Sequence, residues 1–379
     1  MKHPTNHIFG HTPETLGAWC DERRLPAFRA KQILDWVYAK GVVDPEAMSN
    51  LSKREREMLR DEMVFLSGDV LAHQRASDGT QKLLVQWTDG DARPISASPE
   101  AGTLALPVLG QHVEPDTRRQ TECVMIPADD RRTACISSQV GCPVGCRFCA
   151  SGLSGLDGNL SAGRIVEQVW RLSRILRETD EVGRVTNVVF MGMGEPLSNL
   201  GAVVPAVRAL SSPWGMGISA RRITISTVGL PKAIEKLAEQ LDLPVTLALS
   251  LHAPDDTIRR QLIPWAEYTT IDELLGACKK WFQKTGREIT LEYTLLRGVN
   301  DRPQHAKQLA ELAKTLRANV NLIRYNEVGG LEFKRPRTED VLAFQEILQQ
   351  ARVNAHIRAS RGRDIAAACG QLRHEHQPA

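Results

Sequence analysis

The sequence lacks any apolar run of the roughly 20 residues that a membrane-spanning helix needs. Its first residues, MKHPTNHIFGHTPE, also lack the apolar stretch of a secretory signal peptide. These absences predict a cytoplasmic protein without a membrane partner. The 379 residues are 42% hydrophobic and 25% charged, which is typical of an ordinary globular chain long enough for two or three structural units.

The chain also has little excess of either charge, with 48 basic and 45 acidic residues and a net charge of +3. Bulk charge therefore does not predict nucleic-acid binding, which would require basic residues to cluster. They do cluster in the first 65 residues, at Arg23, Arg24, Arg29, Lys31, Lys53, Arg54, Arg56 and Arg60. Two interpretations remain for this cluster, an ordinary solvated helix surface and a surface that docks RNA.

Cysteines are few, but half of them lie together. Of eight, four fall between Cys135 and Cys149, where Cys142, Cys146 and Cys149 form a Cys-x3-Cys-x2-Cys array. In a reducing compartment such clustering favours metal ligands or reactive thiols over disulfides. Structural zinc usually takes four ligands, often from two Cys-x2-Cys pairs, and no second pair is present. Three thiolates in one loop favour a [4Fe–4S] cluster with one iron open to a ligand, with zinc and free thiols as alternatives.

Local signals divide the chain into units. Residues 1–65 are expected to form a small helical N-terminal domain, with a helix start at Thr12-Pro13 and a capping box from Ser52 to Glu55. Residues 66–120 are expected to hold a β-hairpin followed by a long loop over 89–119. A core over 121–372 and a polar tail over 373–379 complete the predicted organisation.

The core alternates strand-like and helical segments, which predicts an α/β fold with a parallel sheet. Helices are expected near 163–177, 200–211, 231–240, 271–285, 303–317 and 338–352. The strand-like segments between them, counted with the one before Cys142, give six βα units and suggest a partial (β/α)6 barrel. Such sheets bind ligands at the carboxyl ends of their strands.

The residues that follow the strands are small or polar. They are the three clustered cysteines, then Gly192 to Pro196, then Ser226-Thr227, then Ser250-Leu251-His252, and finally Asn326-Glu327. Their shared position predicts one site at a single edge of the sheet.

Five motifs in order resemble one family: SSQVGCPVGCRFCASGLSG, MGMGEPLSNL, ITISTVGL, LALSLHAP and AAACGQL. The array, with Phe148 before its last cysteine, resembles the signature of the radical S-adenosylmethionine superfamily. The whole set resembles the dual-specificity methyltransferases that act on adenosine C2 in 23S ribosomal RNA and transfer RNA. The resemblance covers most of the chain and is interrupted at residues 91–119. It implies a radical S-adenosylmethionine core preceded by the helical domain and the hairpin.

The resemblance implies a role for each matching residue. Cys142, Cys146 and Cys149 would hold the [4Fe–4S] cluster, whose open iron binds S-adenosylmethionine. Gly194 and Glu195 match the motif that faces the methionine amino group. The remaining cofactor contacts match Ser226, Ser250, Leu251, His252 and Asn326, with His252 expected to act through its backbone.

The resemblance also implies a covalent mechanism. Cys369 matches the cysteine that is methylated first and then carries the methylene group to the adenine ring. Cys135 matches the thiol that attacks the Cys369 sulfur, forms a transient disulfide and releases the product. Glu122 matches the base that removes the C2 proton. From residues alone, Cys135 and Cys369 would be ordinary core thiols and Glu122 an ordinary strand charge.

Two other functions remain open at this stage. A relative that methylates C8 of the same ribosomal adenosine shares these cysteines, and a non-enzymatic, metal-dependent RNA-binding protein would need neither Cys135 nor Cys369. The family's Asn-Pro-x-x-Gly segment reads here Asn326-Glu-Val-Gly-Gly, which puts substrate choice more in question than reaction type. The expected partners are the two RNAs and a flavodoxin- or ferredoxin-type electron donor, with the protein acting as a monomer.

Overall fold

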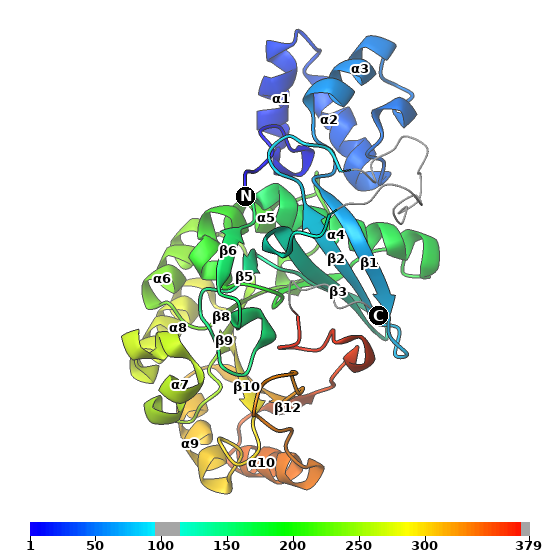
Figure 1. Cartoon of the computed structure of the whole chain (residues 1–379). Coiled ribbons are helices and arrows are strands. Elements are labelled where there is room, and N and C mark those ends of the chain that lie inside the picture. The colour runs from blue at the N-terminus through cyan, green and yellow to red at the C-terminus, as the bar shows by residue number, and fades with distance from the viewer. Residues whose placement is uncertain (95–113, 373–379) are drawn as a thin grey trace.

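The computed structural model describes residues 1–94 and 114–372, and its centre is one large sheet (Figure 1). The strand order is β1-β2-β3-β4-β7-β8-β9-β10-β11-β12. The strands are β1 (Gly68–Arg75), β2 (Gln81–Trp87), β3 (Gln120–Ala128), β4 (Arg131–Cys135), β7 (Asn187–Phe190), β8 (Ile223–Thr227), β9 (Thr246–Ser250), β10 (Ile289–Leu295), β11 (Ala318–Arg324) and β12 (Ala355–Arg358). The tail expected over 373–379 and most of the loop expected over 89–119 lie outside the described residues.

The strands from β4 to β12 pair in parallel, which confirms the predicted α/β fold. The connecting helices confirm the six predicted ones: α4 (Ala162–Thr179), α5 (Leu200–Ser211), α6 (Pro231–Gln240), α8 (Ile271–Thr285), α9 (Pro303–Lys314) and α10 (Thr338–Gln350). β12 adds a strand beyond the six predicted units, because Ala355–Arg358 pairs along the free edge of β11.

Two local elements differ from the sequence-based prediction. The segment before Cys142 is two strands, because the chain leaves the sheet after β4 and β5 (Gln139–Gly141) pairs with β6 (Leu156–Asn159). A short helix, α7 (Asp256–Leu262), was not predicted; it spans only seven residues, too few for a clear apolar period. Among the described residues, no helix is long and apolar enough to cross a membrane.

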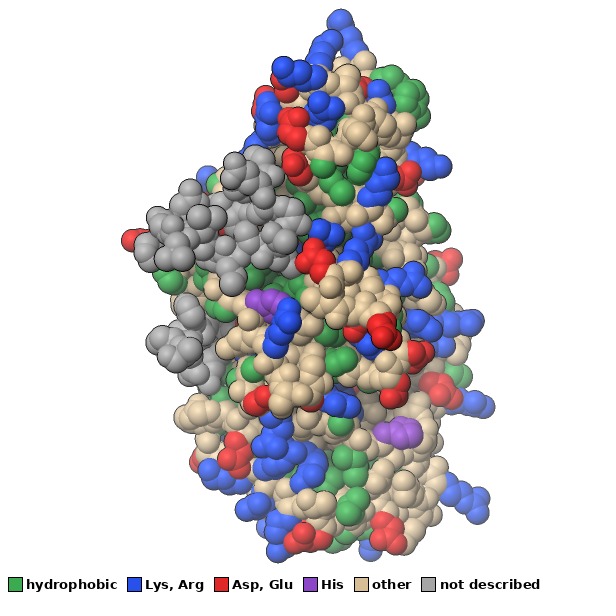
Figure 2. All heavy atoms as spheres, turned by 90° about the vertical axis from the view of Figure 1, so that its right-hand side faces the viewer, with side chains coloured by type: hydrophobic (Ala, Val, Ile, Leu, Met, Phe, Trp, Pro, Cys, Tyr) green, Lys and Arg blue, Asp and Glu red, His purple; other side chains and the backbone are tan. Residues whose placement is uncertain are grey.

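The helical N-terminal unit contains α1 (Pro13–Glu22), α2 (Phe28–Leu34), a π-helical turn (Asp35–Ala39) and α3 (Lys53–Glu62). Both predicted helix starts are present, since the Thr12 and Ser52 hydroxyls cap α1 and α3. Several of its arginines form ion pairs within the unit, including Arg23 with Glu62 at 2.6 Å and Arg29 with Glu55 at 2.8 Å. Figure 2 shows basic side chains spread along one face of the molecule with acidic ones between them.

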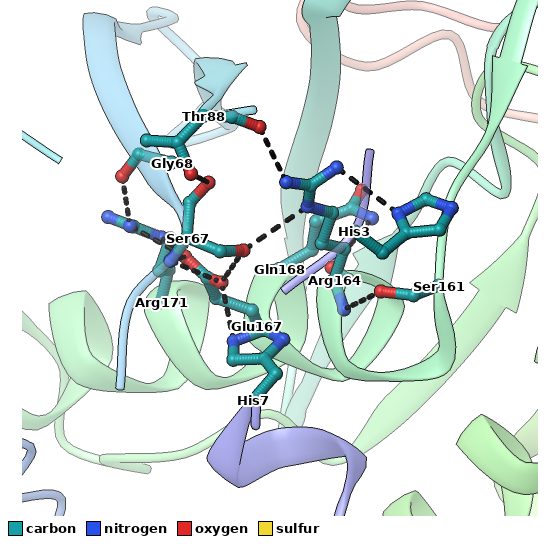
Figure 3. Close-up of polar contacts among 10 residues, drawn as sticks. All are labelled: His3, His7, Ser67, Gly68, Thr88, Ser161, Arg164, Glu167, Gln168 and Arg171. Carbon is teal, nitrogen blue, oxygen red and sulfur yellow. Dashed lines mark hydrogen bonds and ion pairs between the residues drawn. The ribbon is translucent and has the colours of Figure 1, made fainter. Parts of the chain in front are cut away.

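A buried polar network joins the N-terminal unit, the hairpin and α4 (Figure 3). The Glu167 side chain on α4 is 0% exposed and lies 2.7 Å from Arg171 and 3.1 Å from His7. It also accepts hydrogen bonds from the backbone and hydroxyl of Ser67, just before β1. Burial alone would raise the pKa of Glu167, but Arg171, His7 and Ser67 together lower it to about 2. The carboxylate is therefore held by residues from three separate segments.

Replacing Glu167 by Gln should lower the free energy of unfolding by about 3–5 kcal/mol, because Arg171 is left buried without its counter-charge. The stabilisation from Glu167 should be complete above about pH 4.5, its ordinary pKa, and should be lost as the pH falls toward 2. Urea unfolding measures both effects.

The matched control is Glu235→Gln, which breaks the exposed pair with Lys280 and should cost about 0–1 kcal/mol. A loss for Glu167→Gln no larger than that of this control would contradict the account of the network.

Candidate active site

The three clustered cysteines lie on a compact loop directly after β5. Gly141, the last residue of β5, has a φ of +73°, and a Cβ there would lie 2.0 Å from the Gly155 carbonyl oxygen. That close approach lets the Cys142 amide donate to the same carbonyl at 2.8 Å. Only glycine fits this position without moving the backbone. The loop is thus closed on itself, with its thiols held on one side.

All three thiols line one pocket and lie in buried surroundings. Burial raises the pKa of Cys142 to about 12 and that of Cys146 well above its ordinary value, and the neighbouring thiols add to both shifts. Burial also raises the pKa of Cys149. Thiolates become stable here only beside positive charge, so the donor set fits a cationic group. This agrees with the chemistry of a three-cysteine iron–sulfur site.

In residues 1–94 and 114–372, no three His, Cys, Asp or Glu side chains converge on a point that could hold a single metal ion. The observation is compatible with a cluster, because each thiolate of a cluster binds a different iron and the three need not meet at one point.

Glu195 lies in the same pocket, in the turn that follows β7. The turn is shaped by Gly194, whose φ is +100° and whose Cα lies against Gln139. The carboxylate accepts hydrogen bonds from the backbone amides of Leu197 at 3.0 Å and Val228 at 2.8 Å. Burial nevertheless raises its pKa to about 7. A buried carboxyl group with a pKa of about 7 is only partly ionised near neutral pH, so a cationic ligand group beside it would stabilise its charged form.

The ends of β8 and β9 complete the pocket wall. The hydroxyls of Ser226 and Ser250 lie 3.2 Å apart, and both residues line the pocket. His252 follows β9 with a φ of +56° and packs edge-on against Phe148, with ring centroids 5.1 Å apart. Its Nδ1 accepts the Thr294 amide at 3.0 Å, and burial lowers its pKa to about 3. The imidazole is therefore neutral and packed against the cysteine loop, which goes beyond the expected backbone role.

Two further thiols lie close to the same pocket. Cys369 lines it, and Cys135, at the end of β4, is buried behind. Burial raises the pKa of Cys135 to about 12, and the nearby Cys369 adds to the shift. Both thiols are free. The Cys369 segment (residues 362–372) also contacts the cysteine loop, because the Ala150 backbone amide donates to the Gly370 carbonyl at 2.8 Å.

The remaining predicted residues surround the pocket without lining it. Asn326 is buried, and its amide nitrogen donates to the Cys369 carbonyl at 3.3 Å. Leu251 has its side chain in the main core. Glu122, on β3, is buried and forms an ion pair with Lys82 at 2.7 Å.

Sequence reasoning missed two charged residues of the pocket, Glu292 on β10 and Arg358 on β12. Glu292 accepts from Asn321 at 3.0 Å, and Arg358 lies 3.5 Å from Glu292. Cys369 is the main cause of a raised pKa at Arg358, followed by Glu292. For Glu292, a charge in the middle of a mostly apolar strand was the available signal, since buried charges occur where they are paired or functional. Arg358, the last residue of its strand, offered no such signal.

Comparison with known proteins agrees with this arrangement. Residues 136–313 match the radical SAM superfamily, and residues 6–65 match the ribosomal RNA large subunit methyltransferase N-terminal domain. A probable dual-specificity RNA methyltransferase RlmN from Rhodopirellula baltica is 40% identical over 97% of this chain and 91% of its own length. The dual-specificity RNA methyltransferase RlmN of Dichelobacter nodosus is 40% identical over 97% of this chain and 93% of its own.

A solved structure gives the same result. The radical SAM methyltransferase from Sphaerobacter thermophilus superposes with a TM-score of 0.86 at 39% identity, covering 98% of this chain and all of that one. Full-length similarity at this level, together with the cysteine loop and its pocket, shows that the chain belongs to the RlmN family of the radical SAM superfamily.

Proposed function

We propose that this chain is an RNA methyltransferase that methylates C2 of adenosine in 23S ribosomal RNA and in transfer RNA. The observation that carries the proposal is the presence of two free thiols, Cys135 and Cys369, beside the pocket of the three-cysteine loop. A structural or purely RNA-binding role would need no second pair of thiols there. The relatives that match over nearly their full length carry the name dual-specificity RNA methyltransferase.

Cys142, Cys146 and Cys149 would hold a [4Fe–4S] cluster, and S-adenosylmethionine would occupy the adjoining pocket. Together these groups supply a methyl group and a carbon-centred radical. Glu195 would pair with the methionine ammonium group, and Gly194 leaves the backbone open beside it. Ser226, Ser250 and His252 line the pocket wall, while Leu251 and Asn326 would support it from behind.

Three residues of the chain would carry the covalent steps. The Cys369 sulfur would accept a methyl group, which would give up a hydrogen atom to the carbon-centred radical and then bond through its carbon to C2 of adenine. Glu122 would accept the C2 proton, and the one electron left on the adduct would return to the iron–sulfur cluster. The Cys135 thiolate then attacks the Cys369 sulfur, so that an S–S bond forms, the S–C bond breaks, and the carbon leaves with the bond's electron pair to be protonated as the product methyl group.

The substrate base must leave its stack to reach a pocket this deep in the fold. We propose that residues 1–65 dock the RNA, and that the arginines of this unit that are not engaged in ion pairs contact its phosphates. The enzyme would act as a cytoplasmic monomer and receive electrons from a flavodoxin- or ferredoxin-type protein.

The Glu195→Gln variant should bind S-adenosylmethionine about 10- to 100-fold more weakly near pH 8, because a charge-assisted hydrogen bond is lost. The difference should shrink below pH 7, since the wild-type carboxyl, with a pKa of about 7, is then protonated as well. Anaerobic calorimetry on the reconstituted protein measures the affinities. Glu311→Gln, on an exposed face, serves as control. Equal affinity of Glu195→Gln and wild type at pH 8 would refute the ammonium contact.

The Cys135→Ala variant should methylate Cys369 and then stop with RNA covalently attached, because no thiol remains to break the S–C bond. A denaturing gel with labelled RNA detects the adduct, and peptide mass spectrometry locates it at Cys369. Cys278→Ala, which removes an equally buried thiol from α8, should turn over normally. Normal turnover by Cys135→Ala, without trapped RNA, would rule out the resolving role.

A further inference from the structure

The hairpin of β1 and β2 holds the segment that carries Cys369. The Ser77 amide in the hairpin turn donates to Asp364 at 2.8 Å, and the Asp78 carboxylate accepts from the Gly362 amide at 3.0 Å. In Figure 1 the C-terminal segment (red) passes beside this end of the hairpin. These contacts join parts of the chain that are almost 290 positions apart, so the hairpin anchors the Cys369 segment and is more than a simple connection.

One hairpin side chain, Lys82, touches both the Cys369 segment and Glu122. Lys82 pairs in register with Val124, which makes Glu122 its diagonal neighbour on the same face of the sheet. The ammonium lies 2.7 Å from the Glu122 carboxylate, and the two side chains are only 9% and 7% exposed. The same ammonium donates to the Ala366 carbonyl at 3.4 Å, three residues before Cys369.

Their surroundings are apolar. Val124, Cys135, Met193 and Ala367 form a buried cluster at this place. Val124 pairs in register with Lys82, and Ala367 directly follows Ala366 in the sequence. Desolvating a lysine and a glutamate costs free energy that a hydrophobic pair would not. An ion pair kept at such a cost, beside the Cys369 segment and the cluster that contains Cys135, indicates a role in the reaction.

We infer that Lys82 is a positioning residue that holds the charged Glu122 carboxylate against the Cys369 segment. The inference rests on the proposed function, in which the C–H bond at C2 breaks, its proton passes to Glu122 and its electron pair stays on the ring. An ammonium that lies 2.7 Å from the carboxylate and also donates to the Ala366 carbonyl fixes the position of the carboxylate relative to the Cys369 segment. Lys82 acts through Glu122 and does not itself contact the base.

The inference predicts which step fails when Lys82 is replaced. Methylation of Cys369 does not involve Glu122, and the Cys369 segment keeps its anchors at Ser77 and Asp78, so this step should continue in Lys82→Met. RNA turnover should fall about 10- to 100-fold, the effect of a misplaced catalytic group, and covalent RNA adduct should accumulate. Lys82→Arg, which keeps the charge, should recover most of the turnover.

The decisive experiment is a double-mutant cycle with Lys82→Met and Glu122→Gln in the reconstituted full-length protein. Peptide mass spectrometry measures methyl-Cys369, a denaturing gel measures the RNA adduct, and nucleoside analysis measures turnover. Because both residues act in one step, the double variant should be no slower than the slower single variant. Lys280→Met, which removes the exposed lysine paired with Glu235, should match wild type in all three measurements.

Two results for turnover would overturn the inference: a loss in the double variant equal to the product of the two single losses, or wild-type turnover in Lys82→Met. A third is a loss of Cys369 methylation in Lys82→Met as large as its loss of turnover, which would indicate a structural role only. In each of these three cases the wild-type protein would still methylate RNA, so the proposed function would stand. A wild-type protein that never methylates Cys369 would instead overturn the proposed function, and the inference with it.

Discussion

Parallel pairing of β4 with β7 through β12 is the constraint on which the candidate site depends. It brings the carboxyl ends of seven strands to one edge of the sheet, so residues as distant in sequence as Glu195 and Cys369 meet in one pocket. The hairpin strands β1 and β2, together with β3, extend the same sheet and place the Lys82–Glu122 pair beside the Cys369 segment. The helical N-terminal unit is joined to this frame through the buried Glu167 network.

The charges around the pocket follow one pattern. Glu122 and Glu292 each have a cationic partner, in Lys82 and Arg358. Glu195 differs, because backbone amides are its closest described partners and its pKa is raised to about 7. A carboxylate without a strong cationic partner, next to thiols that also disfavour negative charge, is the place where a bound cationic group gains most. Glu195 is therefore suited to a cationic cofactor group, whereas Glu292 and Glu122 already have cationic partners in the chain.

Much of this could be predicted from the sequence, because the signals are local. Apolar periodicity located the six long helices, and capping residues such as Thr12 and Ser52 located helix starts in the N-terminal unit. The cysteine loop followed from its spacing. Contacts between distant segments could not be predicted: no local pattern shows that Lys82 meets Glu122 and Ala366, or that β12 joins the sheet. Such contacts depend on how whole elements pack, which spacing along the chain does not encode.

The most direct test of the central claim is nucleoside mass spectrometry of RNA incubated anaerobically with the reconstituted protein, S-adenosylmethionine and a reductant. Ribosomal and transfer RNA that lack the modification would be supplied separately. The account predicts 2-methyladenosine in both. A peak of 8-methyladenosine would contradict the proposed position of methylation while keeping the thiol chemistry. Unmodified RNA, from protein carrying a full cluster, would contradict the proposed substrate altogether.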